Sequence, residues 1–277
     1  MAKPDHIELP TGERIPILYE DRSVLAIDKP AGWMLVPFSW QKTSRNLQAA
    51  LVSSIGAGDF WARSRGLKYL RFVHRLDADT SGVLLLGKSP GAVNSFGAMF
   101  EGRRMEKVYL AVVCGAPAQS EWTCRLKLAP DPGEVGRMKA DARHGKDAET
   151  HFRLLQTRDQ TSLVEARPVT GRTHQIRVHL AESGHAVIGD VLYAPRPARE
   201  KRAPQGEGGP LTPALSPSEG ERGNRRQPSG ESRLRGSGLG LRAVGLSYMC
   251  PFTRRQVDIR APVAEFVRHY GFDIPRL

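Results

Sequence analysis

The chain has 277 residues, of which 40% are hydrophobic and 25% are charged, a composition typical of one large or two small folded domains. Lysine and arginine outnumber aspartate and glutamate by 41 to 29, and the resulting net charge of +12 favours a polyanionic partner, either nucleic acid or an anionic membrane surface. Apolar runs such as 83–86 are far shorter than the roughly 20 residues of a membrane span, and the N-terminus lacks the apolar core of a signal peptide.

Short β-prone runs alternate with helical patterns along the chain, and they predict an α+β domain rather than a strict βαβ repeat. We expect a hairpin around the turn 20–23, and a helix that is capped by Thr43 or Ser44 and extends to Ile55. The remaining expected elements, in chain order, are a buried strand at 83–86, a helix at 92–101, strands at 107–113, 150–156 and 162–168, a helix at 173–183 that stops at Gly184, paired strands at 246–249 and 256–259, and a helix at 264–270.

Residues 196–240 differ in composition from the rest of the chain. They contain six prolines and nine glycines, 15 of 45 residues, and no aromatic residue. Such a segment has too little apolar surface to offset the entropy of ordering it. We therefore predict a flexible insertion rich in Gly, Pro and Arg, which divides the domain into 1–195 and 241–277.

The densest polar cluster is residues 74–82, His-Arg-Leu-Asp-Ala-Asp-Thr-Ser-Gly, just before the buried strand. Asp, Thr, Ser and Gly are favoured turn residues, so an isolated run of this kind is more often a turn than a site. The functional alternative is a carboxylate that neighbouring cations keep ionised, able to act as nucleophile or general base.

A second cluster, residues 170–179, reads Thr-Gly-Arg-Thr-His-Gln-Ile-Arg-Val-His at the expected start of a helix. A solvated basic face is the simplest interpretation, while a helix N-terminus also favours phosphates or a carboxylate. His174 and His179 lie five apart, which places them on different faces of a helix or strand and disfavours a shared zinc. The three cysteines form no Cys-x-x-Cys pair, which disfavours a cysteine zinc site or a disulfide framework and is typical of the cytoplasm.

Lys107 and Tyr109 share one face of an expected strand, a pattern that suits base stacking but is more often an ordinary strand. Neither the Gly-x-x-x-x-Gly-Lys-Ser/Thr motif nor a Gly-x-Gly-x-x-Gly after a strand occurs, so use of ATP or a dinucleotide is not indicated.

Together, the clusters resemble the RluA-type pseudouridine synthases. Residues 74–82 match that family's His-Arg-Leu-Asp-x-x-Thr-Ser-Gly signature completely, and residues 170–193 resemble its other long signature. The segments 17–21, 29–32, 107–111 and 146–152 also fit the family pattern. The resemblance covers about 15–195 and resumes near 241–262.

The resemblance implies one catalytic domain with a largely antiparallel mixed central sheet flanked by helices. It implies a monomer that isomerises uridine to pseudouridine in structured RNA, either rRNA or tRNA, without a cofactor. Asp77 would be the catalytic carboxylate, Tyr109 would stack on the flipped base, and Arg177 would hold Asp77 by a salt bridge. Arg75 would fill the gap that the extruded base leaves. The RNA-binding residues implied are Arg75, His74, Lys107, Arg172 and His174.

Two departures from the family pattern concern RNA contacts. Only about 16 residues precede the first expected strand, so the small RNA-binding domain of many members is expected to be absent. Arg242 stands where the final strand of the family often carries His, which affects the expected substrate contacts. The alternatives are a non-catalytic RNA-binding module of the same fold, and a carboxylate hydrolase that would need a second acid such as Asp79.

Overall fold

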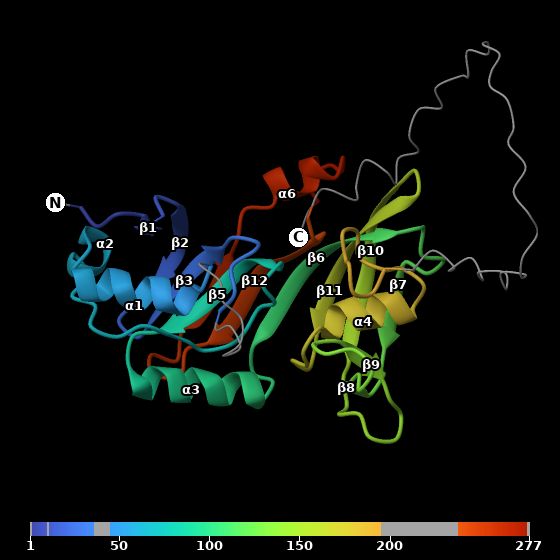
Figure 1. The fold of residues 1–277 in the computed structure, drawn as a ribbon, viewed down its shortest axis with the longest axis horizontal. Helices are drawn as coiled ribbons and strands as arrows, with labels where there is room; N and C mark the ends of the chain where they lie inside the picture. The colour runs from blue at the N-terminus through green and yellow to red at the C-terminus, as the bar shows by residue number, and fades with distance from the viewer. Residues whose placement is uncertain (1, 10, 36–44, 195–237, 276–277) are drawn as a thin grey trace, which may run out of the picture.

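The computed structural model describes residues 2–9, 11–35, 45–194 and 238–275. Within these ranges an eleven-stranded sheet runs in the order β1-β2-β3-β5-β12-β6-β11-β10-β7, with β13 paired to β12 and β4 to β5 (Figure 1). Only the β12–β5 pair is parallel, and the other pairs of this sheet are antiparallel. The described residues therefore form the α+β fold with a largely antiparallel mixed sheet.

The strands of the large sheet are β1 (His6–Glu8), β2 (Arg14–Glu20), β3 (Val24–Lys29), β4 (Arg71–Phe72), β5 (Ser81–Gly87), β6 (Glu106–Cys114), β7 (Glu121–Cys124), β10 (Thr150–Arg158), β11 (Thr161–Pro168), β12 (Leu241–Met249) and β13 (Gln256–Arg260). A separate hairpin pairs β8 (Leu128–Pro130) with β9 (Met138–Ala140). The helices are α1 (Leu47–Ala57), α2 (Phe60–Arg63), α3 (Pro90–Glu101), α4 (Gln175–Glu182) and α6 (Ala264–His269). No helix of the described ranges is long and apolar enough to span a membrane.

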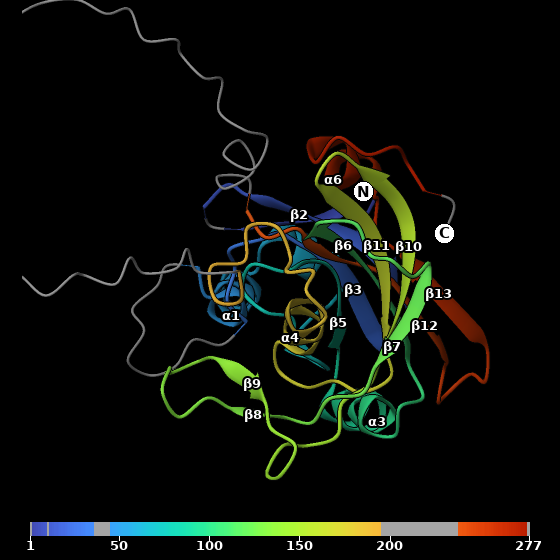
Figure 2. The same ribbon diagram turned by 90° about the vertical axis from the view of Figure 1, so that its right-hand side faces the viewer.

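Helices cover both faces of the sheet because side chains along each strand alternate between the faces. On the N-terminal half, α1 packs against Leu25 and Leu84, whereas α3 packs on the opposite face against Ala26 and Leu85. On the C-terminal half, α4 and α6 lie on opposite faces in the same way (Figure 2). Tyr109 on β6 contacts the apolar clusters of both α1 and α4, so these two helices cover the same face, with Tyr109 between them.

The predicted hairpin, the long strands and the helices at 92–101 and 173–183 are confirmed to within a few residues. The fold starts earlier than expected, with β1 at His6–Glu8. The expected cap residues Thr43 and Ser44 lie outside the described residues, and the residue that caps α1 is Asn46, whose side chain accepts a hydrogen bond from the Ala49 amide. The sequence analysis missed the short strands β1, β4, β7, β8 and β9 because strands of two to four residues carry little periodicity.

The end of the predicted insertion is also shifted. Residues 195–237 lie outside the described ranges, but the fold resumes at Gly238, not at Leu241. The Leu239 side chain is buried in the cluster under α4, and the Gly240 amide donates to the Ile188 carbonyl. A Cβ on Gly189 would lie 1.8 Å from the Gly238 carbonyl oxygen, so the segments before and after 195–237 meet side by side.

Gly82, the last residue of the first polar cluster, permits the parallel contact between β5 and β12. Its φ is +110°, and a Cβ there would lie 2.0 Å from the Ala243 carbonyl oxygen. Gly82→Ala is therefore expected to lower the free energy of unfolding by about 3 kcal/mol or more, as measured by urea denaturation. Gly56→Ala, in α1 where no atom of another segment lies within 4 Å of the added methyl, is the control and should be neutral or stabilising. Equal stability of the two variants would contradict the close approach.

Candidate active site

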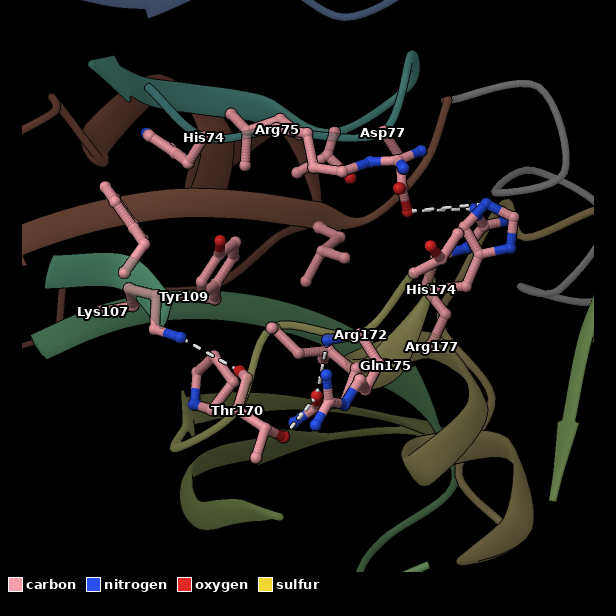
Figure 3. Close-up of a pocket in the computed structure, with 18 of the residues that line it drawn as sticks. His74, Arg75, Asp77, Lys107, Tyr109, Thr170, Arg172, His174, Gln175 and Arg177 are labelled. Atoms are coloured by element: carbon pink, nitrogen blue, oxygen red, sulfur yellow. Dashed lines mark hydrogen bonds and ion pairs between the residues drawn. The ribbon is translucent and has the colours of Figure 1, made fainter. Parts of the chain in front are cut away.

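A cavity of about 380 Å³ opens on the face of the sheet where Tyr109 lies. One wall is the loop between β4 and β5, and the other is the segment from Pro168 into α4 (Figure 3). The structure brings together all eight residues that the family resemblance implies as catalytic or RNA-binding. The cavity is lined by His74, Arg75, Asp77, Lys107, Tyr109, Arg172, His174 and Arg177.

Asp77 lies on a loop whose backbone is held by the buried side chain of Lys29. The Lys29 side chain is fully buried, and its ammonium donates to the carbonyls of Pro30, Ala78 and Thr80 at 3.0, 2.7 and 3.0 Å. Burial lowers the pKa of Lys29 to about 8, while the charges of Asp79 and Asp77 oppose that shift. Since these three bonds use all the ammonium protons, Lys29 fixes the backbone that directly follows Asp77.

Arg177 on α4 joins Asp77 to a second carboxylate. Its Nη1 lies 3.3 Å from Asp77 Oδ2, while its Nε and Nη2 donate to Asp190 at 2.7 and 2.8 Å. The Asp190 side chain is fully buried. Although burial works against the charge, Asp190 and Asp77 together hold the pKa of Arg177 above its ordinary value. The planar guanidinium is therefore oriented by Asp190, and the remaining Nη1 faces Asp77.

His174 precedes α4 and faces the same carboxylate. Its Nε2 lies 3.9 Å from Asp77 Oδ2, and its Nδ1 is 2.8 Å from the Tyr193 hydroxyl. Burial lowers the pKa of His174, whereas the charge of Asp77 raises it. His179, five residues on, is buried and bonds instead to Thr150, so the two imidazoles point to different places. The described residues contain no cluster of three or more metal-ligating side chains.

Tyr109 and Lys107 project from β6 on the same face, as their spacing predicted (Figure 3). Burial, followed by the charge of Asp77, raises the pKa of Tyr109 above its ordinary value, so the phenol stays protonated at neutral pH. The Lys107 ammonium donates to the Thr170 carbonyl at 3.0 Å, and burial, with the nearby Arg103, lowers its pKa to about 8.

His74 and Arg75 adopt different environments although they are neighbours. The His74 ring stacks on Phe100 at 4.4 Å, and its Nε2 accepts the Leu85 amide at 3.0 Å. Burial, with Lys107, lowers the pKa of His74 to about 3, so this ring is neutral and fixed. Arg75 is exposed and lines the cavity.

Arg172 lies on the loop before α4. Its Nε donates to the Asp147 carbonyl, and its amide donates to Gln175 Oε1 at 2.9 Å. The same Gln175 oxygen accepts the Thr170 hydroxyl, and its amide nitrogen donates to Glu149 and Thr150 on the β10 side. This network sets the loop geometry and leaves Arg172 at the rim.

Sequence reasoning did not single out Lys29, Asp190, Tyr193, Phe100 or Arg103 as site residues. Lys29, Asp190 and Tyr193 stand in segments that fit the family pattern, but nothing in a sequence shows that they meet Asp77 or Arg177. Arg242, which departs from the pattern, pairs with Asp28 at 2.6 Å and bonds Ser81. Asp28 and Arg242 alternate with residues packed under α1, so this pair lies on the opposite face from the cavity.

The cavity therefore holds the Asp77 carboxylate, the Arg177 and His174 side chains that face it, the Tyr109 ring and a cationic rim. A family model described as RNA pseudouridylate synthase matches residues 23–182. The chain belongs to the RNA pseudouridylate synthase family. The reaction that gives this family its name is the isomerisation of uridine to pseudouridine in RNA.

Relatives with this name resemble the chain over about two thirds of its length. It is 33% identical over 186 residues to a dual-specificity RNA pseudouridine synthase RluA of Vibrio cholerae, a match that covers 67% of the chain and 71% of the relative. It is 36% identical over 183 residues to the ribosomal large subunit pseudouridine synthase C of Vibrio vulnificus, covering 65% of the chain and 53% of the relative. The chain thus spans about half the length of that second pseudouridine synthase.

Two human pseudouridine synthase structures have a similar fold. The structure of human RNA pseudouridylate synthase domain containing 1 aligns with a TM-score of 0.61 at 25% identity and covers 90% of this chain and 84% of that one. The domain containing 4 protein aligns with a TM-score of 0.66 over 94% of both chains, at 20% identity, and supports the fold alone.

The activity of this pseudouridine synthase is expected to fall above about pH 8. The pKa values of Lys29 and Lys107 are lowered to about 8 by burial, so both lose their protons at a lower pH than an ordinary lysine. Loss of the Lys29 proton removes a donor that fixes the Asp77 loop. Single-turnover rates from about pH 6 to about pH 10 measure the decline, and Lys107→Arg, which keeps its charge, isolates the share of Lys29. A flat profile up to about pH 9.5 would contradict this assignment.

Proposed function

We propose that the chain converts specific uridines in structured RNA, rRNA or tRNA, to pseudouridine, with Asp77 as the catalytic carboxylate. The observation that carries the proposal is the Asp77–Arg177 contact inside a cavity that also contains Tyr109. A non-catalytic RNA-binding module would not need a carboxylate whose loop is fixed by a buried lysine and whose side chain is paired with an arginine. The catalytic domain comprises 1–195 and 241–277, with 196–240 as an insertion whose last residues, Leu239 and Gly240, pack against the domain.

The reaction breaks the bond between ribose C1′ and uracil N1, turns the base, and forms a bond from C1′ to C5. The C5 proton is lost and N1 gains a proton, so the product has the mass of the substrate. Asp77 can attack C1′ or remove a ribose proton, and both routes need an ionised carboxylate at a fixed position. Arg177 holds the side chain of Asp77, and Lys29 holds the backbone of its loop.

Tyr109 provides a surface on which an extruded uracil can stack. Its ring lies between the Asp77 loop and the Lys107 side chain, and its phenol stays protonated because burial raises its pKa. Extruding a base costs a few kcal/mol, which stacking and phosphate contacts offset. Arg75 and Arg172 at the rim, together with the net charge of +12, supply the phosphate contacts.

We further propose that the protein acts in the cytoplasm as a monomer without a nucleotide cofactor. None of the three cysteines is exposed, and Cys124 and Cys250 are buried free thiols, which agrees with a reducing compartment. Light scattering of the purified chain tests the monomer, and a mass of two chains at working concentration would refute it.

The experiment that identifies the RNA is carbodiimide mapping of pseudouridines in total RNA from cells with and without this gene. We expect one or a few stops to vanish from rRNA or tRNA when the gene is deleted and to return with the wild-type chain. An unchanged map would refute the proposed substrates.

A further inference from the structure

Tyr193 has four contacts that connect the catalytic carboxylate to a distant hairpin. Its hydroxyl accepts the Met138 amide of β9 at 2.8 Å and lies 2.8 Å from His174 Nδ1. Its ring faces two guanidinium groups, those of Arg177 at 5.1 Å and Arg137 at 5.4 Å from the ring centre. The side chain is almost fully buried. Both His174 and Arg177 in turn face Asp77.

We propose that Tyr193 is a positioning residue that holds the His174 imidazole with its Nε2–H toward Asp77 and ties it to β9. This inference rests on the proposed function of Asp77. It adds to that function a hydrogen-bond chain that runs from the Met138 amide through Tyr193 to His174.

The direction of these bonds follows from the donors available. The Met138 amide can only donate, so the Tyr193 oxygen accepts there, and its own proton is free to point at His174 Nδ1. An imidazole that accepts at Nδ1 carries its proton on Nε2 when neutral. That nitrogen lies 3.9 Å from Asp77 Oδ2, where an N–H is attracted to the carboxylate and a lone pair would be repelled.

The backbone of His174 supports a role beyond packing. Its φ is +54°, in the left-handed region that non-glycine residues adopt at a cost of about 1 kcal/mol or more. A segment that stores such strain needs fixed side-chain partners to persist. Tyr193 is one of them, and Asp190 in turn holds the Tyr193 amide at 3.2 Å while it orients Arg177.

The test compares Tyr193→Phe, which removes only the hydroxyl, with His174→Asn, the double variant and the control Tyr248→Phe. Tyr248 is also buried, and its hydroxyl has no partner in the part of the chain that is described. We expect Tyr193→Phe to slow single-turnover isomerisation about tenfold and to leave the RNA Kd within about twofold. The double variant should be no slower than the slower single variant, because both changes break the same Tyr193–His174 hydrogen bond. Tyr248→Phe should match the wild type.

Long-range ¹⁵N NMR of the His174 ring reports its tautomer, which would not change in Tyr193→Phe if Tyr193 served only for packing. The wild type should show the Nε2–H tautomer, and Tyr193→Phe should show a larger fraction of the Nδ1–H tautomer than the wild type. The pKa of His174 should also rise in that variant, since its neutral form loses a donor. The charged or titratable groups around this ring are Asp77, Arg75, Arg177, Asp190 and Tyr193.

Two outcomes would overturn the inference. One is an Nδ1–H tautomer in the wild type, a result that does not depend on any variant folding. The other is a Tyr193→Phe protein whose His174 spectrum and reaction rate both equal those of the wild type. Absence of pseudouridine from all wild-type reactions would instead refute the proposed function, while the tautomer measurement would still stand.

Discussion

Asp77→Asn is expected to abolish isomerisation, with a loss of at least about 10³-fold in single-turnover rate. The amide keeps the shape of the side chain but loses the charge and the nucleophilic or basic oxygen. RNA affinity should stay within several fold, because the phosphate contacts come from Arg75, Arg172 and other cations at the cavity rim. Tritium release from uracil-labelled RNA measures the rate, and filter binding measures the affinity.

The matched control is Asp79→Asn, two residues along the same loop. Asp79 is exposed and does not line the cavity, so its rate should remain near that of the wild type. A turnover of Asp77→Asn close to the wild type would refute Asp77 as the catalytic group. A loss in Asp79→Asn equal to that in Asp77→Asn would show that the loop charge matters rather than the Asp77 carboxylate.

We expect substitution of Arg177 to slow the chemical step, and substitution of Arg172 to weaken mainly the binding of RNA. Arg177→Lys should slow the single-turnover rate about 10- to 100-fold, since an ammonium cannot hold Asp190 with two parallel bonds and also face Asp77. Arg172→Ala should raise the RNA Kd and flatten its salt dependence with a smaller change in rate, because Arg172 lies at the rim.

Arg177→Ala serves as the stability control for this comparison. It leaves the fully buried Asp190 without its partner and should lower the free energy of unfolding by about 3–5 kcal/mol. Rates are therefore compared only between variants whose thermal melts remain cooperative at the assay temperature. Equal rate losses in Arg177→Lys and Arg172→Ala, or a larger loss in Arg172→Ala, would mean that the wrong arginine has been assigned to Asp77.

The sequence was informative where a pattern carries its own physical cause. The apolar run at 83–86, the turn residues of 20–23 and the glycine after the 173–183 helix each predict a local structure that the fold confirms. The alternation of Lys107 and Tyr109 predicted their shared face. The first cluster alone was more consistent with a turn than with a site, and only the family resemblance singled out Asp77.

Contacts between distant segments were beyond such patterns. Lys29 reads as the last residue of a strand, yet its ammonium lies under a loop some 50 positions away. Gly82 has the sequence context of a turn glycine, but a side chain is excluded there by the close approach of β12, a strand that follows residues 195–237 in the chain. Arg177 could be paired with Asp77 only by resemblance, and its stronger partner Asp190 has no signal in composition or spacing.

The most direct test of the central claim is the fate of the uracil in a single purified reaction. Wild-type protein is incubated with an RNA that carries labelled uracil, and the digested nucleosides and the free bases are both analysed by mass spectrometry. We expect pseudouridine in an RNA of unchanged mass, no released uracil, and neither product with Asp77→Asn. Release of free uracil would show hydrolysis by the carboxylate instead of isomerisation, and pseudouridine formed equally by Asp77→Asn would remove that residue from the chemistry.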